Sequence, residues 1–189
     1  MKINEIFYSL QGEGHFAGTP AVFVRFAGCN LKCPFCDTNH SAVKEMTCQE
    51  ILEEINRYEA RRVILTGGEP TLQLTAEFIN ALHRAGYLIN VESNGTRKLP
   101  AKVDWLVVSP KEGGDVVADD IDELKVVFTG PDYDPAAFLS IPAGEYFLQP
   151  CDVGLSEQNR SIVAAAVEYV KRHPQWRLSL QTHKLINIP

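Results

Sequence analysis

Short runs of apolar, largely β-branched residues recur along the chain and predict seven strands. They are Ala21–Phe26, Arg62–Leu65, Leu88–Val91, Trp105–Val108, Leu124–Phe128, Tyr146–Leu148 and Arg177–Leu180. Several of these runs are continuously apolar instead of alternating with polar residues. Continuous apolar strands separated by helical segments are typical of a parallel sheet that is covered on at least one face.

Three helices are predicted between these strands. The first begins at a capping box formed by Thr47 and Glu50, which is a signature of helix N-termini. An apolar stripe over Phe78–Ala85 predicts the second helix, which ends at Gly86. The third helix covers Ser156–Arg172, with the hydroxyl of its first residue as the expected cap.

The length of the chain limits the architecture. A full eightfold (β/α) barrel needs roughly 250 residues, whereas this chain has 189. We therefore expect an α/β fold built as a partial, open (β/α) barrel with mostly parallel strands and few helices. Residues 1–189 are expected to form a single domain, because no linker or internal repeat interrupts them. Functional loops in such folds follow the carboxyl ends of the strands.

Composition and charge exclude several classes of protein. Hydrophobic residues make up 45% of the chain and charged residues 22%, as in ordinary globular domains. The net charge of −6 argues against a nucleic-acid partner. The first residues lack the apolar run of a signal peptide, and no stretch approaches the ~20 apolar residues that span a bilayer. We therefore expect no membrane association and a cytoplasmic location, where thiols stay reduced.

Cys29, Cys33 and Cys36 form a C-x3-C-x2-C pattern directly after the predicted strand Ala21–Phe26. This close spacing favours a metal site over a disulfide framework. A [4Fe–4S] cluster usually has four cysteine ligands. Three ligands leave one iron able to bind another molecule, so the segment predicts a reactive cluster on a loop at a strand end.

Two other interpretations of the cysteine segment stay open. Structural zinc commonly has four Cys or His ligands in two separated pairs, and His40 is the nearest candidate for a fourth ligand. A ferredoxin-type cluster would require Cys48 or Cys151 as its fourth ligand. Both of these cysteines stand alone in the sequence, where the role of a small buried apolar residue is more typical.

The cysteine pattern, with Phe35 immediately before the last cysteine, resembles the signature of the radical S-adenosylmethionine (SAM) superfamily. The resemblance implies that SAM binds the open iron through its amino and carboxylate groups. One electron from the cluster then cleaves SAM into methionine and a 5′-deoxyadenosyl radical. Phe35 corresponds to the position that lies near the adenine.

Polar residues at the ends of later strands correspond to the SAM contacts of similar enzymes. Gly67-Gly68-Glu69 matches the superfamily motif for the SAM amino group, and its glycines permit a close backbone approach. The same resemblance assigns SAM contacts to Glu92, Ser93, Ser109, Lys111 and Gln149. Because the carboxyl ends of parallel strands meet at one edge of a sheet, we expect these side chains to lie close together.

Both ends of the chain resemble one family within the superfamily. The segments are Ser9-Leu-Gln11-Gly12-Glu13-Gly14 and Leu180-Gln181-Thr182-His183-Lys184. With the cysteine loop, they resemble the 7-carboxy-7-deazaguanine synthases of queuosine biosynthesis over essentially the whole chain. The implied reaction converts 6-carboxy-5,6,7,8-tetrahydropterin into 7-carboxy-7-deazaguanine. The radical removes a hydrogen from C6, the ring contracts, the hydrogen returns to regenerate SAM, and ammonia is lost.

This resemblance implies substrate contacts from Gln11, Glu13, Arg25, Gly67, His183 and Pro189. Glu13 suits the donor-rich edge of a pterin, and Gln11 can both donate and accept. Arg25 can pair bidentately with the substrate carboxylate. An arginine in an apolar strand requires an anionic partner, for which the substrate or Glu69 is expected.

Further components follow from the same resemblance. Thr38 corresponds to a position that contacts Mg²⁺, a hard cation that keeps several waters. A homodimer and a flavodoxin-type electron donor are also implied. Two alternatives remain: a glycyl-radical-enzyme activase, which shares the cysteines and the Gly-Gly-Glu-Pro motif but acts on a protein backbone, and a non-catalytic iron–sulfur or zinc module that binds a partner.

Overall fold

The computed structural model describes residues 1–36 and 43–189. Its strands are β1 Lys2–Leu10, β2 Pro20–Phe26, β3 Lys44–Glu45, β4 Arg62–Gly67, β5 Leu88–Ser93, β6 Trp105–Val108, β7 Glu123–Phe128, β8 Glu145–Pro150 and β9 Trp176–Leu178. Its α-helices are α1 Cys48–Ile55, α2 Ala76–Arg84, α3 Ser156–Arg172 and α4 Thr182–Ile186, with short 3-10 helices η1 Pro70–Leu72 and η2 Pro135–Ser140.

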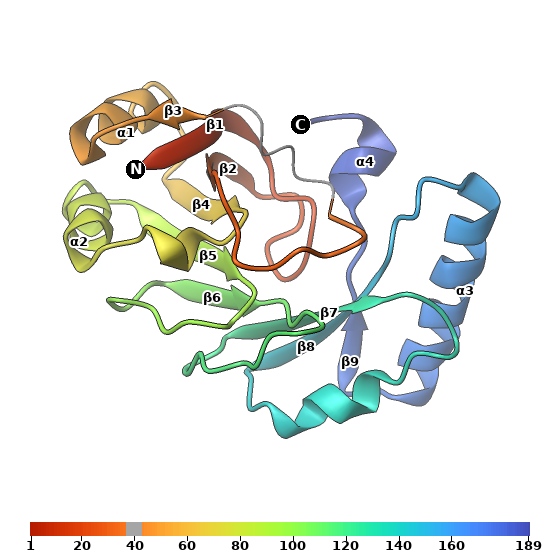
Figure 1. Cartoon of the computed structure of the whole chain (residues 1–189). Helices are drawn as coiled ribbons and strands as arrows, with labels where there is room; N and C mark the ends of the chain where they lie inside the picture. The colour runs from red at the N-terminus through yellow and green to blue at the C-terminus, as the bar shows by residue number, and fades with distance from the viewer. Residues whose placement is uncertain (37–42) are drawn as a thin grey trace.

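All of these strands join one curved sheet in the order β3-β1-β2-β4-β5-β6-β7-β8-β9. From β2 to β9 every neighbouring pair is parallel, whereas β1 pairs antiparallel with β2 and β3. Within the described residues, β3 and β9 do not pair with each other, so the barrel stays open. Helices α1, α2 and α3 lie on the outer side of the sheet (Figure 1). The expected partial, open (β/α) barrel with few helices is confirmed.

The two faces of the sheet differ in chemistry because side chains alternate along each strand. The outer face is apolar: Val22, Val24, Val63, Leu65, Leu124 and Val126 are fully buried and join the main core with residues of the helices. The residues between them face the concave side, where Arg25, Thr66 and Lys125 line a cavity. The alternation therefore gives the barrel an apolar outer layer and a concave face that carries both polar side chains and a small apolar cluster of Ala21, Phe23 and Ile64.

The loop between β1 and β2 enters the barrel from the amino-terminal ends of the strands. The Phe16 ring lies against the guanidinium of Arg62, whose carbon is 3.7 Å from the ring centroid, and packs edge-on against Trp105. The backbone N–H of His15 donates to Glu123 at 3.1 Å. Since these partners begin β4, β6 and β7, the loop closes the end of the barrel opposite the cysteine segment.

The structure also corrects details of the sequence prediction. Strand β1 was not predicted, and a register shift between Ile3 and Glu5 interrupts the alternation that would have indicated it. The prediction that Ser156 caps the last helix is wrong, because Leu155 is the N-cap and no side chain makes the capping bond. Helix α4 has five residues, too few to produce a helical period.

The capping box of α1 offers a test of local stability. The Thr47 hydroxyl accepts from the Glu50 N–H at 3.2 Å, and the Glu50 carboxylate accepts from the Thr47 N–H at 2.7 Å. Thr47→Ala should lower the free energy of unfolding by about 1 kcal/mol, measured by anaerobic denaturant titration. Thr47→Ser keeps the oxygen and should match the wild type, and equal losses in both variants would contradict a capping role.

Candidate active site

A cavity of about 750 Å³ occupies the concave side of the barrel at the carboxyl ends of the strands. Its volume suits a small-molecule site. The residues predicted from the sequence that line it are Gln11, Glu13, Arg25, Cys29, Cys33, Phe35, Cys36, Gly67, Gly68, Glu92, Ser93, Ser109, Lys111, Gln149, His183 and Pro189. Glu69 is not among the lining residues, and Thr38 lies outside the described residues. Both ends of the chain therefore contribute to one cavity.

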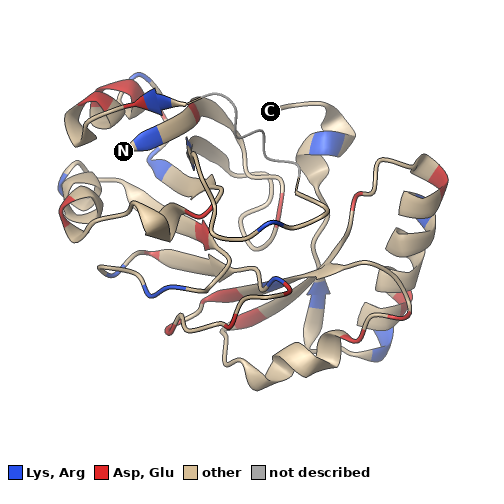
Figure 2. Cartoon of the chain, viewed as in Figure 1, with Lys and Arg blue, Asp and Glu red and all other residues tan. Residues whose placement is uncertain are grey.

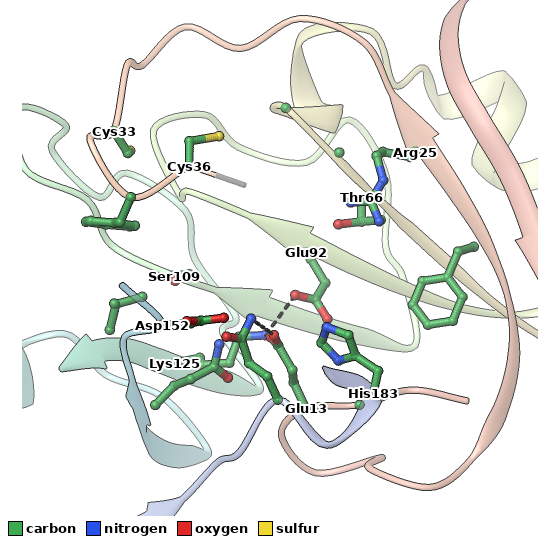
Figure 3. A pocket seen from close by; sticks show the side chains of 18 of the residues that line it. Glu13, Arg25, Cys33, Cys36, Thr66, Glu92, Ser109, Lys125, Asp152 and His183 are labelled. Carbon is green, nitrogen blue, oxygen red and sulfur yellow. Dashed lines mark hydrogen bonds and ion pairs between the residues drawn. The ribbon is translucent and has the colours of Figure 1, made fainter. Parts of the chain in front are cut away.

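The cysteine loop follows β2 and forms one side of the cavity. Figure 3 shows Cys33 and Cys36 across the cavity from Glu13, Glu92 and Lys125. Burial raises the pKa of the Cys33 thiol; Lys111 opposes this shift, and nearby Cys29 and Cys36 add to it. Cys29 and Cys36 thus both lie within electrostatic reach of Cys33.

The donor set of this loop, three free thiols, suits a cubane. No group of three His, Cys, Asp or Glu side chains in residues 1–36 and 43–189 is placed to hold one ion. A cubane binds each thiolate at a different iron, so its sulfurs need not converge on one point. Cys151 is buried at the cavity wall, whereas Cys48 packs against the core from α1. His40, considered for zinc, lies outside the described residues.

Gly67 and Gly68 pack directly against the backbone that leads into the cysteine loop. A Cβ on Gly68 would lie 2.1 Å from the carbonyl oxygen of Gly28, and one on Gly67 would lie 2.2 Å from that of Phe26. The Gly68 N–H donates to Phe26 at 3.0 Å, and the Glu69 N–H donates to Gly28 at 2.9 Å. These glycines therefore allow the end of β4 to support the cysteine loop, a role that the sequence analysis did not identify.

The Glu69 carboxylate is fully buried and joins the ends of β4 and β5. One oxygen accepts from the backbone N–H and hydroxyl of Thr71 at 3.0 and 2.6 Å and from the Ser93 hydroxyl at 2.9 Å. The other oxygen accepts from the Asn94 N–H at 2.7 Å. This geometry gives Glu69 the function of fixing the rim of the cavity around Gly68 and Ser93.

Acidic and basic residues are interspersed over the helices, strands and loops (Figure 2), and Lys125 is the buried basic residue of the described chain. Its side chain is only 4% exposed, and its ammonium group contacts Glu13 at 2.6 Å and Glu92 at 2.8 Å. Gln11 donates to Glu92 at 2.8 Å, and Gln181 donates to Glu13 at 3.0 Å. Dashed lines in Figure 3 mark the Lys125 contacts.

The sequence analysis missed Lys125, although a lysine within an apolar strand was a usable signal. Burial alone would lower the pKa of Lys125, but the attraction of Glu13, Glu92 and Glu123 raises it above its ordinary value. Burial alone would raise the pKa of Glu13, but its contact with Lys125 outweighs this and holds the pKa at about 2. Lys125 and Glu13 therefore carry opposite charges at neutral pH.

Lys111 lies at the rim beside the cysteine loop. Its ammonium group donates to the carbonyl oxygen of Ser109 at 2.9 Å and to the hydroxyl of the same residue. Burial, reinforced by the charge of Lys125, lowers the pKa of Lys111 to about 8. An incoming carboxylate would favour the charged form of this lysine, since it supplies the anionic partner that the buried ammonium group needs.

The carboxyl-terminal segment forms another wall of the cavity. The Thr182 N–H donates to the Gly12 carbonyl at 2.9 Å, and a Cβ on Gly12 would lie 2.1 Å from Nδ1 of His183. The Ser9 hydroxyl donates to a Pro189 oxygen at 2.8 Å. These contacts bring His183 and Pro189 beside the loop that carries Gln11 and Glu13.

Arg25 extends from β2 into the cavity, where Figure 3 shows it near Thr66. Its Nε donates to Glu5 at 2.7 Å. The expectation that Glu69 pairs with Arg25 is wrong, because Glu5 is the partner in the structure. The terminal nitrogens of the guanidinium still carry the donors that a bidentate carboxylate requires.

The packing of Gly68 predicts a variant that loses the cluster without losing a ligand. In Gly68→Ala, the new Cβ should displace Gly28 and the adjacent cysteine loop, so reconstituted protein should contain much less iron and sulfide. Gly86→Ala is the control, because Gly86 has a φ of +82° but nothing within 4 Å of its Cβ position. Equal iron contents in the two variants would contradict this support role.

Comparison with known proteins agrees with this site. The model of the radical SAM superfamily matches residues 23–124. The 7-carboxy-7-deazaguanine synthase of Bacteroides thetaiotaomicron is 53% identical over 187 residues, covering 99% of this chain and 98% of the relative. The synthase of Bordetella pertussis is 40% identical over 209 residues, with 99% and 98% covered. The crystal structure of QueE from Escherichia coli has a TM-score of 0.78 at 27% identity and covers 95% of this chain and 92% of that one. The chain therefore belongs to the radical SAM superfamily and, within it, to the 7-carboxy-7-deazaguanine synthase family.

Proposed function

We propose that this chain converts 6-carboxy-5,6,7,8-tetrahydropterin into 7-carboxy-7-deazaguanine and ammonia. The observation that carries the proposal is a single cavity lined by the cysteine loop and by Gln11, Glu13, Arg25 and His183. A radical formed beside the cysteines would thus meet a substrate held by polar groups across the same space. The names of the relatives support the product.

The cysteine side of the cavity suits SAM and its cluster. Cys29, Cys33 and Cys36 would hold a [4Fe–4S] cluster, which with bound SAM supplies the 5′-deoxyadenosyl radical. The residues assigned to SAM are Phe35, Gly68, Glu69, Glu92, Ser93, Ser109, Lys111 and Gln149. Glu69 supports this side through Ser93 and Asn94, while Lys111 offers a cation to the methionine carboxylate. Gln149 accepts from Ser179 at 2.8 Å, which fixes its amide orientation.

The opposite side suits a pterin that carries a carboxylate. Glu13 is ionised and can accept hydrogen bonds from the donor edge of the ring. Arg25 offers a forked cation to the carboxylate, and the backbone of Gly67 lies beside it in the cavity wall. His183 and Pro189 border the same space from the carboxyl-terminal segment, where they can limit the shape of the bound ring.

The glycyl-radical-enzyme activase is a weaker alternative. That reaction requires access for a protein backbone, whereas here the segments around Gly12 and Thr182 bind each other across one wall of the cavity. A non-catalytic module would not need the polar residues on both sides of the site. The relatives from Bacteroides thetaiotaomicron and Bordetella pertussis are synthases, which also favours the small substrate.

Assembly and location are part of the proposal. Within the described residues the barrel stays open, and an open barrel leaves strand edges that a homodimer can cover. A small flavodoxin-type protein would supply the electron, and the reducing cytoplasm suits the thiols. Among the described residues, no helix has both the length and the apolar character needed to cross a membrane.

Anaerobic turnover tests the proposed function directly. Reconstituted protein incubated with SAM, a reductant and the carboxytetrahydropterin should form the deazaguanine chromophore and release ammonia. Arg25→Ala and Glu13→Ala should each lower kcat/KM for this product by about 10- to 100-fold, because each removes a charged hydrogen bond. Both variants should retain uncoupled cleavage of SAM, measured as 5′-deoxyadenosine.

Arg57→Ala is the matched control, since Arg57 is exposed and pairs with Glu54 on the outer helix. It should turn over like the wild type. If cluster-loaded wild type cleaves SAM but forms no deazaguanine chromophore, the proposed reaction is refuted. Equal loss of SAM cleavage and product in the Arg25 and Glu13 variants would refute their assignment to the substrate.

Magnesium dependence is tested separately. Turnover by metal-stripped protein should rise on addition of Mg²⁺, because a hard cation can bind a hydroxyl and the substrate carboxylate together. Thr38→Val should shift this response to higher Mg²⁺ concentration while SAM cleavage without substrate stays unchanged. An identical Mg²⁺ response in wild type and variant would exclude Thr38 as a contact.

A further inference from the structure

Lys125 is buried where three separate segments meet inside the barrel. It extends from β7 to Glu13, which belongs to the loop after β1, and to Glu92, which belongs to β5. Gln11 and Gln181 then donate to the outer oxygens of the same two carboxylates. One ammonium group thus fixes two acids that come from distant parts of the sequence.

Other charged groups approach Lys125 from neighbouring elements, and Asp152 lines the same cavity. Glu123 lies two residues earlier on the same face of β7, and burial raises its pKa. Lys111 approaches from the loop after β6, and His183 lies near Glu13 from α4. Lys125 is the cation in direct contact with both Glu13 and Glu92, and its charge is the main influence that lowers the pKa of Glu13.

Removal of this ammonium group would change the capacity of the two carboxylates to accept hydrogen bonds. Two carboxylates that share a confined site repel each other, so one of them retains a proton and its pKa rises. A protonated carboxyl group turns one acceptor into a donor. The edge of a pterin that carries the ring N–H and amino groups presents donors, and two donors that face each other cost binding free energy.

We propose that Lys125 is a positioning residue for substrate recognition, holding Glu13 and Glu92 as a pair of anionic acceptors that face the donor edge of the pterin. The inference rests on the proposed function. It adds that Glu13 and Glu92 bind the substrate as a pair whose charges depend on Lys125. It also places Glu92, which the resemblance assigns to SAM, within reach of the substrate side. Lys125 itself need not touch the substrate.

The pH dependence of KM for the pterin distinguishes a lysine that only stabilises the fold from one that positions the two carboxylates. In the wild type the ammonium group of Lys125 contacts both carboxylates, so KM for the pterin should stay flat between pH 6 and 9. In Lys125→Met the pair should share a proton near neutrality. KM should then be raised about tenfold or more at pH 6 and should fall as the pH rises, because deprotonation restores the second acceptor.

Two further variants complete the experiment. Lys125→Arg keeps the charge and should keep a KM that does not vary with pH, even if its absolute KM is higher. Lys98→Met is the matched control, since Lys98 is exposed and pairs only with Asp119 among the contacts described for it; its kinetics should equal those of the wild type.

The outcomes separate the two proposals. If cluster-loaded wild type does not turn over the pterin, the proposed function is wrong. If the wild type turns over but Lys125→Met shows a pH-independent KM, the inference about Lys125 is wrong. If Lys125→Met does not fold, Lys125→Arg decides: a KM that falls with rising pH in that variant would likewise overturn the inference.

Discussion

The alternation of side chains along one curved, parallel sheet is the constraint on which the other features depend. Each strand must place apolar residues outward, where the helices cover them, and its intervening residues inward. In β7 this rule buries Leu124 and Val126 in the core and leaves Lys125 facing the cavity. A shift of one residue in the register would exchange the two sets, so the stability of the core and the composition of the site are fixed together.

The two sides of the cavity are held by different physical means. The cysteine side depends on close backbone contact, since Gly68 and Gly28 approach each other where a Cβ would not fit, and on the buried Glu69 carboxylate. The opposite side depends on charge, with Lys125 between Glu13 and Glu92. Steric fit tolerates little variation in geometry, whereas charge pairing tolerates some rearrangement but requires a fixed ionisation state.

Local patterns in the sequence were sufficient to predict most of the fold and the cavity, but not the contacts between distant segments. Apolar runs located β2 and β4 to β9, and motif residues at strand ends do line one cavity. Periodicity could not reveal the partner of Arg25, because Glu5 lies on a bulged strand that the alternation does not show. Lys125 was missed for a related reason, because folding is what brings Glu13 and Glu92 into contact with it.

The loop between β1 and β2 has a consequence for how this architecture can change over time. In most (β/α) barrels the loops that determine substrate specificity lie at one end and the elements that stabilise the fold lie at the other. Substrate specificity can therefore change with little loss of stability. Here the segment that carries Gln11 and Glu13 also places Phe16 against Arg62 and Trp105 to seal the far end of the barrel. A change of this loop that alters the substrate would therefore also disturb the contacts of Phe16 with Arg62 and Trp105. Replacing the loop with that of a relative would require compensating substitutions at these positions.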